Sequence, residues 1–175
     1  MTLVISGTNR PGSNTYLVSK YIYETLATSK KHLIDIGEYS DLLNSENLYD
    51  GDKLPNDFKN FQDNLLIPAE KIIIVSPEYN GSFPGVLKTF FDAISVRKSK
   101  DSLFHKNAAL VGVATGRAGN LRGLEHMTGF LNHLGLIIFP NKLPISKVGD
   151  YIDDKGLQKD EMSALNSFLE GFQAF

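Results

Sequence analysis

Residues Thr2–Ile36 read TLVISGTNRPGSNTYLVSKYIYETLATSKKHLIDI, and they contain the unit from which the rest of the chain is built. The runs Thr2–Ser6 and His32–Ile36 are short, apolar and rich in β-branched residues, which favours strands buried on both faces. Between them, Tyr16–Ser29 places apolar residues at helical spacing, and Ser6–Thr15 is polar. A strand, a helix and a second strand in this order predict two parallel strands joined by a crossover helix.

The same alternation continues along the chain. Apolar runs predict three more strands, at Lys71–Ser76, Ala108–Ala114 and Leu136–Phe139. Apolar stripes predict helices around Phe58–Leu66, Val86–Ile94, Leu124–Leu134 and Met162–Phe172. Five such repeats indicate an α/β sandwich of three layers, in which a five-stranded parallel sheet carries helices on both faces. At 175 residues, the chain is expected to form one domain, residues 1–175.

Composition narrows the function. The formal net charge is −2, so no basic field is present to attract nucleic acid or an anionic membrane. The chain has no cysteine, which excludes disulfides and thiolate metal sites, and its four histidines form no metal-ligand pattern. No signal peptide or membrane-spanning run is recognisable. We therefore expect a cytoplasmic protein without a metal site.

The loop Ser6–Thr15 follows a strand and opens a helix, and it can hold an anion. Ser13 or Asn14 is suited to cap the helix, whose free amides and dipole favour negative charge. Glycines let the backbone wrap closely, and the neutral donors of the loop are joined by Arg10, whose guanidinium suits phosphate. An ordinary turn with a capped helix is the alternative interpretation of the same residues.

The kind of phosphate is restricted by what the loop lacks. Gly7 and Gly12 have the spacing of a P-loop, but Ser13 and Asn14 stand where that motif needs a lysine and a hydroxyl residue. The glycine pattern of a dinucleotide-binding turn is also missing. A nucleoside triphosphate is therefore disfavoured, and a monophosphate ester remains.

The stretch Ser76–Ser95, SPEYNGSFPGVLKTFFDAIS, is the most specific in the chain. It follows a strand, turns at Asn80-Gly81 and enters a helix near Pro84. Because ligands of such sheets bind beyond the carboxyl ends of the strands, this loop is expected to lie beside the first. Its amides and Tyr79 suit a flat heteroaromatic ring with polar edges.

The two loops together resemble the NADPH-dependent FMN reductase family, which has the flavodoxin-like fold. The resemblance rests on Ser6–Thr15, on Pro77–Ser82, on Pro84-Gly85 and Leu87-Lys88, and on a glycine-containing third loop after the fourth strand. It implies non-covalently bound FMN that takes hydride from NADPH or NADH and passes electrons to a flavin, quinone, azo dye or similar acceptor. The flavin carries the chemistry, so no catalytic acid or base is predicted.

The resemblance also implies a set of cofactor-binding residues. The phosphate is expected at Thr8, Arg10, Ser13, Asn14 and Thr15, and the flavin ring along Pro77, Glu78, Tyr79, Asn80 and Gly81. Thr115, Gly116, Arg117 and Gly119 are expected to border the other edge of the ring. The chain departs from the family at Asn120, where a second glycine is common, although asparagine tolerates left-handed backbone angles.

Two rival functions share this fold. A flavodoxin-type electron carrier would bind FMN without turning over NAD(P)H, and an FMN-free relative would bind another phosphate ester. The net charge of −2 and Arg10 argue mildly against the carrier. The resemblance further implies a homodimer or homotetramer, and we expect the helix that carries the apolar stripe from Leu87 to Ile94, or the one with the stripe from Leu124 to Leu131, to join the subunit interface.

Overall fold

The computed structural model describes residues 1–153, 156–158 and 162–175. Its central sheet contains β1 (Thr2–Ser6), β2 (Lys31–Asp35), β3 (Lys71–Pro77), β4 (Asn107–Val113), β5 (Ile137–Ile138) and β6 (Leu143–Ile145). The strand order is β2-β1-β3-β4-β5, all pairs are parallel, and β6 also pairs with β4. This is the flavodoxin-like order, and it confirms the predicted parallel sheet.

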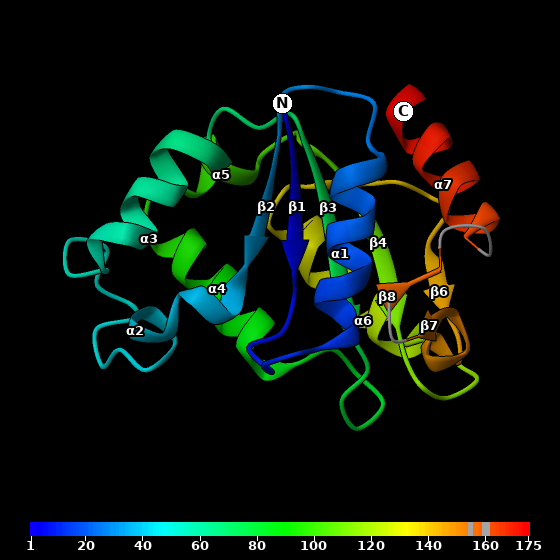
Figure 1. Ribbon diagram of the computed structural model, residues 1–175. Coiled ribbons are helices and arrows are strands. Elements are labelled where there is room, and N and C mark those ends of the chain that lie inside the picture. Colours follow the sequence, from blue (N-terminus) through cyan, green and yellow to red (C-terminus); the bar gives the residue numbers. More distant parts are fainter. Residues whose placement is uncertain (154–155, 159–161) are drawn as a thin grey trace.

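Helices cover both faces of the sheet, which makes the three layers (Figure 1). The helices are α1 (Asn14–Thr25), α2 (Ser40–Leu43), α3 (Asn56–Phe61), α4 (Gly85–Val96), α5 (Ser99–Leu103), α6 (Leu121–His133) and α7 (Ser163–Ala174). α1 and α7 pack with Val4, Ile73 and Val111 on one face. α3, α4 and α6 pack with Leu3, Ile72 and Leu110 on the other.

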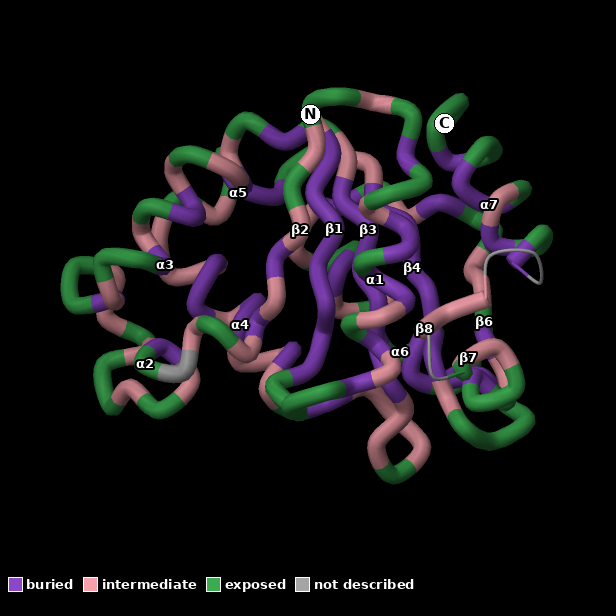
Figure 2. The backbone as a smooth tube through the Cα atoms, in the orientation of Figure 1, coloured by how far each residue is buried: buried purple, intermediate pink, exposed green. Residues whose placement is uncertain are grey.

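Alternation along each strand separates these two cores. Neighbouring residues of β1 point to opposite faces, so Leu3 and Val4 belong to different clusters although both are fully buried. Figure 2 shows the central strands buried along most of their length. Continuous apolar strands of this kind are expected where helices cover both faces.

The fifth strand differs from its prediction. Only Ile137 and Ile138 of the expected run Leu136–Phe139 are assigned to β5, and β6 resumes the pairing with β4 at Leu143. Pro140 lies in the interruption and has no amide to donate to a neighbouring strand. The edge of the sheet is therefore made of two short strands, of which the second has no counterpart among the predicted elements.

Further short elements were not predicted from the sequence. A 3₁₀ turn, η1 (Ile36–Glu38), follows β2, and another, η3 (Val148–Tyr151), follows β6. The helix predicted around Phe58–Leu66 is present, but its second half is a π-helical segment, η2 (Gln62–Leu66), which follows α3. The short strand β7 (Ile152–Asp153) pairs antiparallel with β8 (Gly156–Leu157). Each has five residues or fewer, too short for periodicity to reveal.

The last helix is fastened to the domain by polar contacts at both ends. The Tyr21 hydroxyl of α1 donates to Asn166 Oδ1 at 2.9 Å. At the other end, Lys71 Nζ donates to the carbonyls of Phe172 and Gln173 at 3.1 and 2.6 Å. Since these carbonyls lie in the last turn of α7, the lysine satisfies acceptors that the helix itself leaves open.

Candidate functional site

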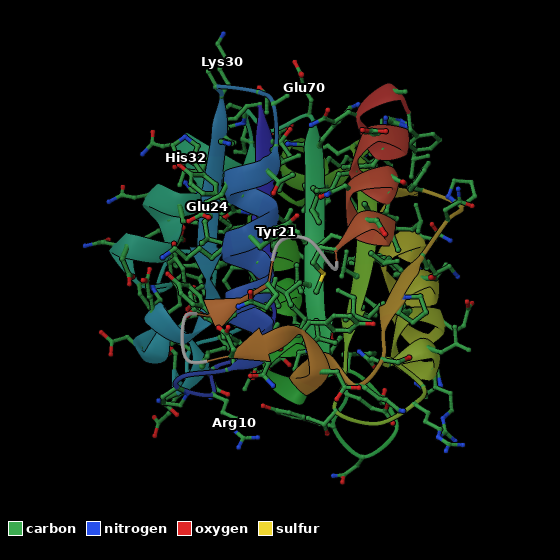
Figure 3. All side chains as sticks on the ribbon, turned by 45° about the vertical axis from the view of Figure 1, so that its right-hand side comes forward. Arg10, Tyr21, Glu24, Lys30, His32 and Glu70 are labelled. Atoms are coloured by element: carbon green, nitrogen blue, oxygen red, sulfur yellow. The ribbon has the colours of Figure 1, made fainter. Side chains whose placement is uncertain are left out.

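Three loops meet at one edge of the sheet, beyond the carboxyl ends of β1, β3 and β4. The first two are held together where they leave the sheet, because the Gly7 amide donates to the Val75 carbonyl at 2.8 Å. A Cβ at Gly7 would lie 2.7 Å from that oxygen, so only glycine fits there. Arg10 projects from this edge, whereas Lys30 and Glu70 lie at the opposite one (Figure 3).

The loops enclose a cavity of about 270 Å³. Of the residues predicted to bind the cofactor, it is lined by Arg10, Ser13, Asn14, Thr15, Pro77, Glu78, Tyr79 and Thr115. It is also lined by Pro11, Gly12, Val113, Ala114 and Val148. The structure therefore brings the three loops to one cavity, as their positions after successive strands predict.

The first loop presents unused donors to the cavity. Ser13 is the helix cap, since its side-chain oxygen accepts from the Tyr16 amide at 3.1 Å. The amides of residues 12–15 have no acceptor within the described residues. The Arg10 guanidinium has no carboxylate partner within the same part of the chain. Four free amides at a helix start beside a free guanidinium form a site for an anion such as phosphate.

The second loop is a tight turn with its own free amides. Tyr79 and Ser82 exchange backbone hydrogen bonds of 2.8 and 3.1 Å, and Asn80 and Gly81 between them have φ of 52° and 79°. Within the described residues, the amides of Asn80 and Gly81 donate to no protein acceptor. The turn can therefore offer hydrogen bonds to a ligand edge without giving up any of its own.

A side-chain contact joins the first loop to the second. The Thr8 and Tyr79 hydroxyls lie 2.8 Å apart, and Thr8 Oγ1 also accepts from the Arg10 amide at 3.3 Å. Thr8 is 1% exposed and does not line the cavity. Its observed contacts set the position of Arg10 and Tyr79, which both face the cavity.

The third loop contributes Thr115 to the cavity and anchors the rest of its residues elsewhere. Gly119 is buried under Pro144 of β6, where a Cβ would lie 2.8 Å from that residue. The carbonyl of Arg117 accepts from Ser146 Oγ at 2.6 Å. Asn120, a residue type that tolerates left-handed backbone angles, has φ 66°.

The cavity lining differs from the predicted site in both directions. Thr8, Asn80, Gly81, Gly116, Arg117 and Gly119 lie outside the lining. Pro11, Gly12, Val113, Ala114 and Val148 line it although they are not among the predicted cofactor-binding residues. Val113 ends β4 and Ala114 follows it, which are positions that sequence can identify, whereas Val148 arrives through the unpredicted turn η3. No sequence signal marks that residue.

The residues present fit FMN. The free amides of residues 12–15 and Arg10 match a phosphate ester, and the cavity lacks the lysine that a triphosphate site needs. Pro77, Val113 and Val148 give apolar walls, while the free amides of the second turn can meet polar ring edges. A ligand with an anionic phosphate at one end and a flat, partly apolar ring at the other matches this lining, and FMN is such a ligand.

The part of the chain that the structure describes has neither a cluster of metal-ligating side chains nor a membrane-spanning helix. Among residues 1–153, 156–158 and 162–175, no group of histidine and carboxylate side chains is arranged to hold a metal ion. None of the helices in that part of the chain has the length and apolarity needed to cross a bilayer.

Known proteins with a similar sequence are reductases. The family model of NADPH-dependent FMN reductase matches residues 1–150. The chain is 27% identical to the NADPH azoreductase of Bacillus sp. strain OY1-2 over 179 residues, which cover 99% of this chain and 90% of that protein. It is 28% identical to the 2-hydroxy-1,4-benzoquinone reductase of Burkholderia sp. over 110 residues, or 61% of this chain and 60% of that one.

A solved structure shares the fold. The flavoenzyme FerB of Paracoccus denitrificans, an NAD(P)H:(acceptor) oxidoreductase, superposes with a TM-score of 0.78 at 21% identity, covering 98% of this chain and 93% of that one. With the match of the family model, the chain belongs to the NADPH-dependent FMN reductase family and is an FMN-dependent NAD(P)H oxidoreductase.

Proposed function

We propose that the cavity binds FMN with its phosphate at the start of α1 and its ring along the turn after β3. This proposal rests on four backbone amides without an acceptor, those of residues 12–15, and on Arg10, which has no acidic partner in the described residues. These groups line the same cavity as Tyr79. Ser13, Asn14 and Thr15 add neutral donors to the phosphate site. Pro77, Glu78 and Tyr79 lie along the ring, and Asn80 and Gly81 present their amides to its edge.

The third loop completes this proposed site. Thr115 lines the cavity opposite the second loop, and Gly116 and Arg117 follow it on the exposed rim. Gly119, buried under Pro144, holds the end of the loop in place rather than contacting the ring. Arg117 is left on the rim with its guanidinium available to a nicotinamide nucleotide phosphate.

The protein's part in the reaction is to bind and to orient. When bound, FMN accepts hydride from NAD(P)H and delivers electrons to a second substrate. The amides of Asn80 and Gly81 favour negative charge near the ring edge because they are unbonded N–H dipoles fixed by the turn. Hydrogen bonds to both loops hold Tyr79 in place beside the ring. No side chain is needed as a proton-transfer catalyst in this arrangement.

We infer that the second substrate is a quinone or an azo compound. An azoreductase and a benzoquinone reductase are among the relatives, and both substrate classes are flat and conjugated. A flat acceptor can occupy the same face of the ring that the nicotinamide leaves, so the two substrates alternate. Plots of the reciprocal initial rate against reciprocal NADPH concentration, at several fixed quinone concentrations, are then expected to be parallel lines. Intersecting lines would contradict a shared site.

The colour of the purified protein separates this function from its rivals. A yellow preparation that bleaches within seconds of anaerobic NADPH addition supports the reductase. A yellow preparation that NADPH does not bleach supports an electron carrier. A colourless protein that takes up no added FMN would overturn the proposed cofactor site. Because the protein consumes NAD(P)H, we place it in the cytoplasm, where that reductant is maintained.

We also propose a homodimer formed through α4 or α6. Both helices start directly after site loops, and α6 carries Leu121, which is 50% exposed. Leu121→Glu is expected to shift the sedimentation coefficient toward a monomer at micromolar concentration. Ile137→Glu is the matched control, since Ile137 is 44% exposed and lies in β5, outside both helices. A wild-type protein that sediments as a monomer would contradict this proposal.

A further inference from the structure

Asn120 is a polar residue buried in an unusual way. It precedes α6 with a left-handed backbone, φ 66° and ψ 26°, and it is 0% exposed. A residue at this position ordinarily uses its side chain to cap the helix, but Asn120 makes no such bond. Its amide turns back toward the sheet instead.

The side-chain amide of Asn120 donates hydrogen bonds to the end of β3. Its Nδ2 donates to the carbonyls of Ser76 and Pro77 at 3.0 and 2.9 Å, and it lies 3.4 Å from Ser76 Oγ. These are the two residues from which the second loop departs. The third loop is thereby tied, through one side chain, to the base of the turn that carries Glu78 and Tyr79.

Glycines on two elements make the space for this side chain. A Cβ at Gly123 of α6 would lie 2.1 Å from Asn120 Oδ1, and also 2.9 Å from the amide nitrogen of Phe83. A Cβ at Gly112 of β4 would lie 3.1 Å from Asn120 Cβ and 2.1 Å from the Gly119 carbonyl. Because no other residue type fits either position as the chain stands, the surroundings are shaped to the asparagine.

Holding Asn120 there has a cost. Its Oδ1 is buried without a hydrogen-bond partner in the described part of the chain. Turning the amide over would bring that oxygen against two carbonyl oxygens, so the donor must face β3. Glycine would adopt the same backbone angles with less strain and would leave no unpaired oxygen. The residue is therefore expected to have a role other than helix capping.

We propose that Asn120 is a positioning residue that fixes the flavin loop, Pro77–Ser82, against the third loop and so determines how tightly the flavin ring is held. This inference rests on the proposed FMN site. It concerns the ring half alone, because Asn120 donates to the base of the second loop and has no hydrogen bond to residues 12–15, where the phosphate is proposed to bind.

The test compares FMN with riboflavin, which has the ring and lacks the phosphate. Asn120→Gly removes the hydrogen bonds to the Ser76 and Pro77 carbonyls and allows the same backbone angles. It is expected to raise the dissociation constants of FMN and riboflavin by the same factor, about tenfold for two lost hydrogen bonds. His105→Gly is the matched control, because His105 also has positive φ, 61°, and lies at the opposite end of β4. The control is expected to bind both flavins as the wild type does.

Asn120→Asp gives a second, independent readout. Its carboxylate has the same shape but no donor, so riboflavin affinity is expected to be low at pH 8. Protonation at pH 5 restores one O–H donor, and affinity is expected to recover severalfold there. Wild type and Asn120→Gly are expected to show no such recovery.

The outcomes separate the inference from the proposed function. If wild type binds neither flavin, the FMN site itself is wrong. A different outcome is that the wild type binds both flavins and that Asn120→Gly and Asn120→Asp bind riboflavin as tightly as the wild type does. If the urea midpoint alone then falls in the variants, Asn120 has a purely structural role and the inference is overturned.

Discussion

At the scale of single residues, Arg10 is the one charged group of the first loop. It lines the cavity and has no acidic partner in the described chain. Arg10→Ala is expected to weaken FMN binding by about 1.5–3 kcal/mol, the range for a hydrogen bond to a charged group. Riboflavin binding is expected to be unchanged. Fluorescence titration of both flavins measures the difference, with Lys30→Ala at the opposite edge as the charge control.

The hydroxyl pair of Thr8 and Tyr79 makes a second prediction at this scale. Tyr79→Phe removes one partner of the 2.8 Å contact and is expected to weaken FMN binding by about 1 kcal/mol. Thr8→Val is expected to act through the same contact, so the double variant should be no weaker than the worse single one. Additive losses in this double-mutant cycle would show that the hydroxyls act separately.

Local chemistry explains which site residues the sequence could identify. The cap of α1 could be assigned to Ser13 or Asn14 because capping depends on residues a few positions apart, and the structure selects Ser13. Likewise, the residue type of Asn120 indicates that a left-handed backbone is tolerated there, and the structure has φ 66°. The burial of Thr8 and the presence of Val148 depend on contacts between distant segments. Such contacts are set by the packing of the whole domain and leave no local pattern.

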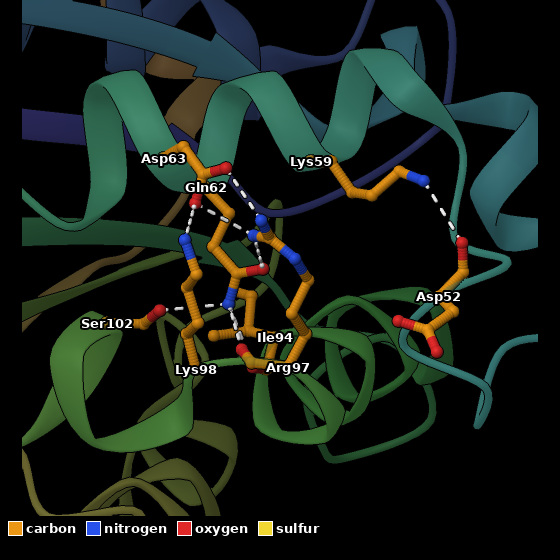
Figure 4. Close-up of polar contacts among 8 residues, drawn as sticks. All are labelled: Asp52, Lys59, Gln62, Asp63, Ile94, Arg97, Lys98 and Ser102. Atoms are coloured by element: carbon orange, nitrogen blue, oxygen red, sulfur yellow. Dashed lines mark hydrogen bonds and ion pairs between the residues drawn. The ribbon is translucent and has the colours of Figure 1, made fainter.

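At the scale of elements, α4 is fixed at its far end by a polar network (Figure 4). Gln62 Nε2 donates to the Ile94 carbonyl at 3.1 Å and to Ser102 Oγ at 2.9 Å, and it also contacts the Arg97 carbonyl. Arg97 forms a two-pronged pair with Asp63, at 2.8 and 2.6 Å. This pair, with Lys98, holds the pKa of the Asp63 carboxyl well below its usual range.

Removing the amide of Gln62 should loosen α4 without touching the cavity. Gln62→Leu leaves buried acceptors unpaired and is expected to lower the free energy of unfolding by about 1–3 kcal/mol, measured in urea. Lys59→Ala, which removes a contact to the Asp52 carbonyl on the exposed surface, is the control and should change stability little. A concurrent tenfold loss of FMN affinity would show that loosening the far end of α4 also disturbs the proposed FMN site.

The sequence predicts the long elements well and the short ones poorly. Helices of twelve or thirteen residues, such as α1, α4, α6 and α7, carry enough turns for an apolar stripe to be recognised. The split of the fifth strand into β5 and β6, and the π-helical turn at Gln62, depend on which hydrogen bonds tertiary neighbours satisfy. Periodicity does not contain that information.

At the scale of the whole molecule, Lys106 links stability to pH. It is 8% exposed, and its Nζ donates to the carbonyls of Leu66 and Ile67 at 2.6 and 2.7 Å. Burial lowers the pKa of its amine to about 8. Between pH 8 and 10 the unfolded chain binds more protons than the folded one at this site, so its contribution to stability rises with pH.

Urea unfolding at pH 7.5 and 9.5 measures this effect. The free energy of unfolding is expected to rise by about 2 kcal/mol more in the wild type than in Lys106→Met, which cannot titrate. The comparison cancels groups common to both proteins, among them Tyr39, whose pKa burial raises to about 12. Equal slopes in the two proteins would contradict a desolvated Lys106.

The broken fifth strand also bears on how copies of the molecule meet. An unbroken outer strand offers a row of free amides and carbonyls on which another chain can add, and this leads to aggregation. Here the outer row is interrupted at Pro140, and Pro144 within β6 has no amide to offer. The opposite outer strand, β2, carries Lys31 and His32. Edge-to-edge growth of the sheet is therefore opposed on one side by missing donors and on the other by basic side chains.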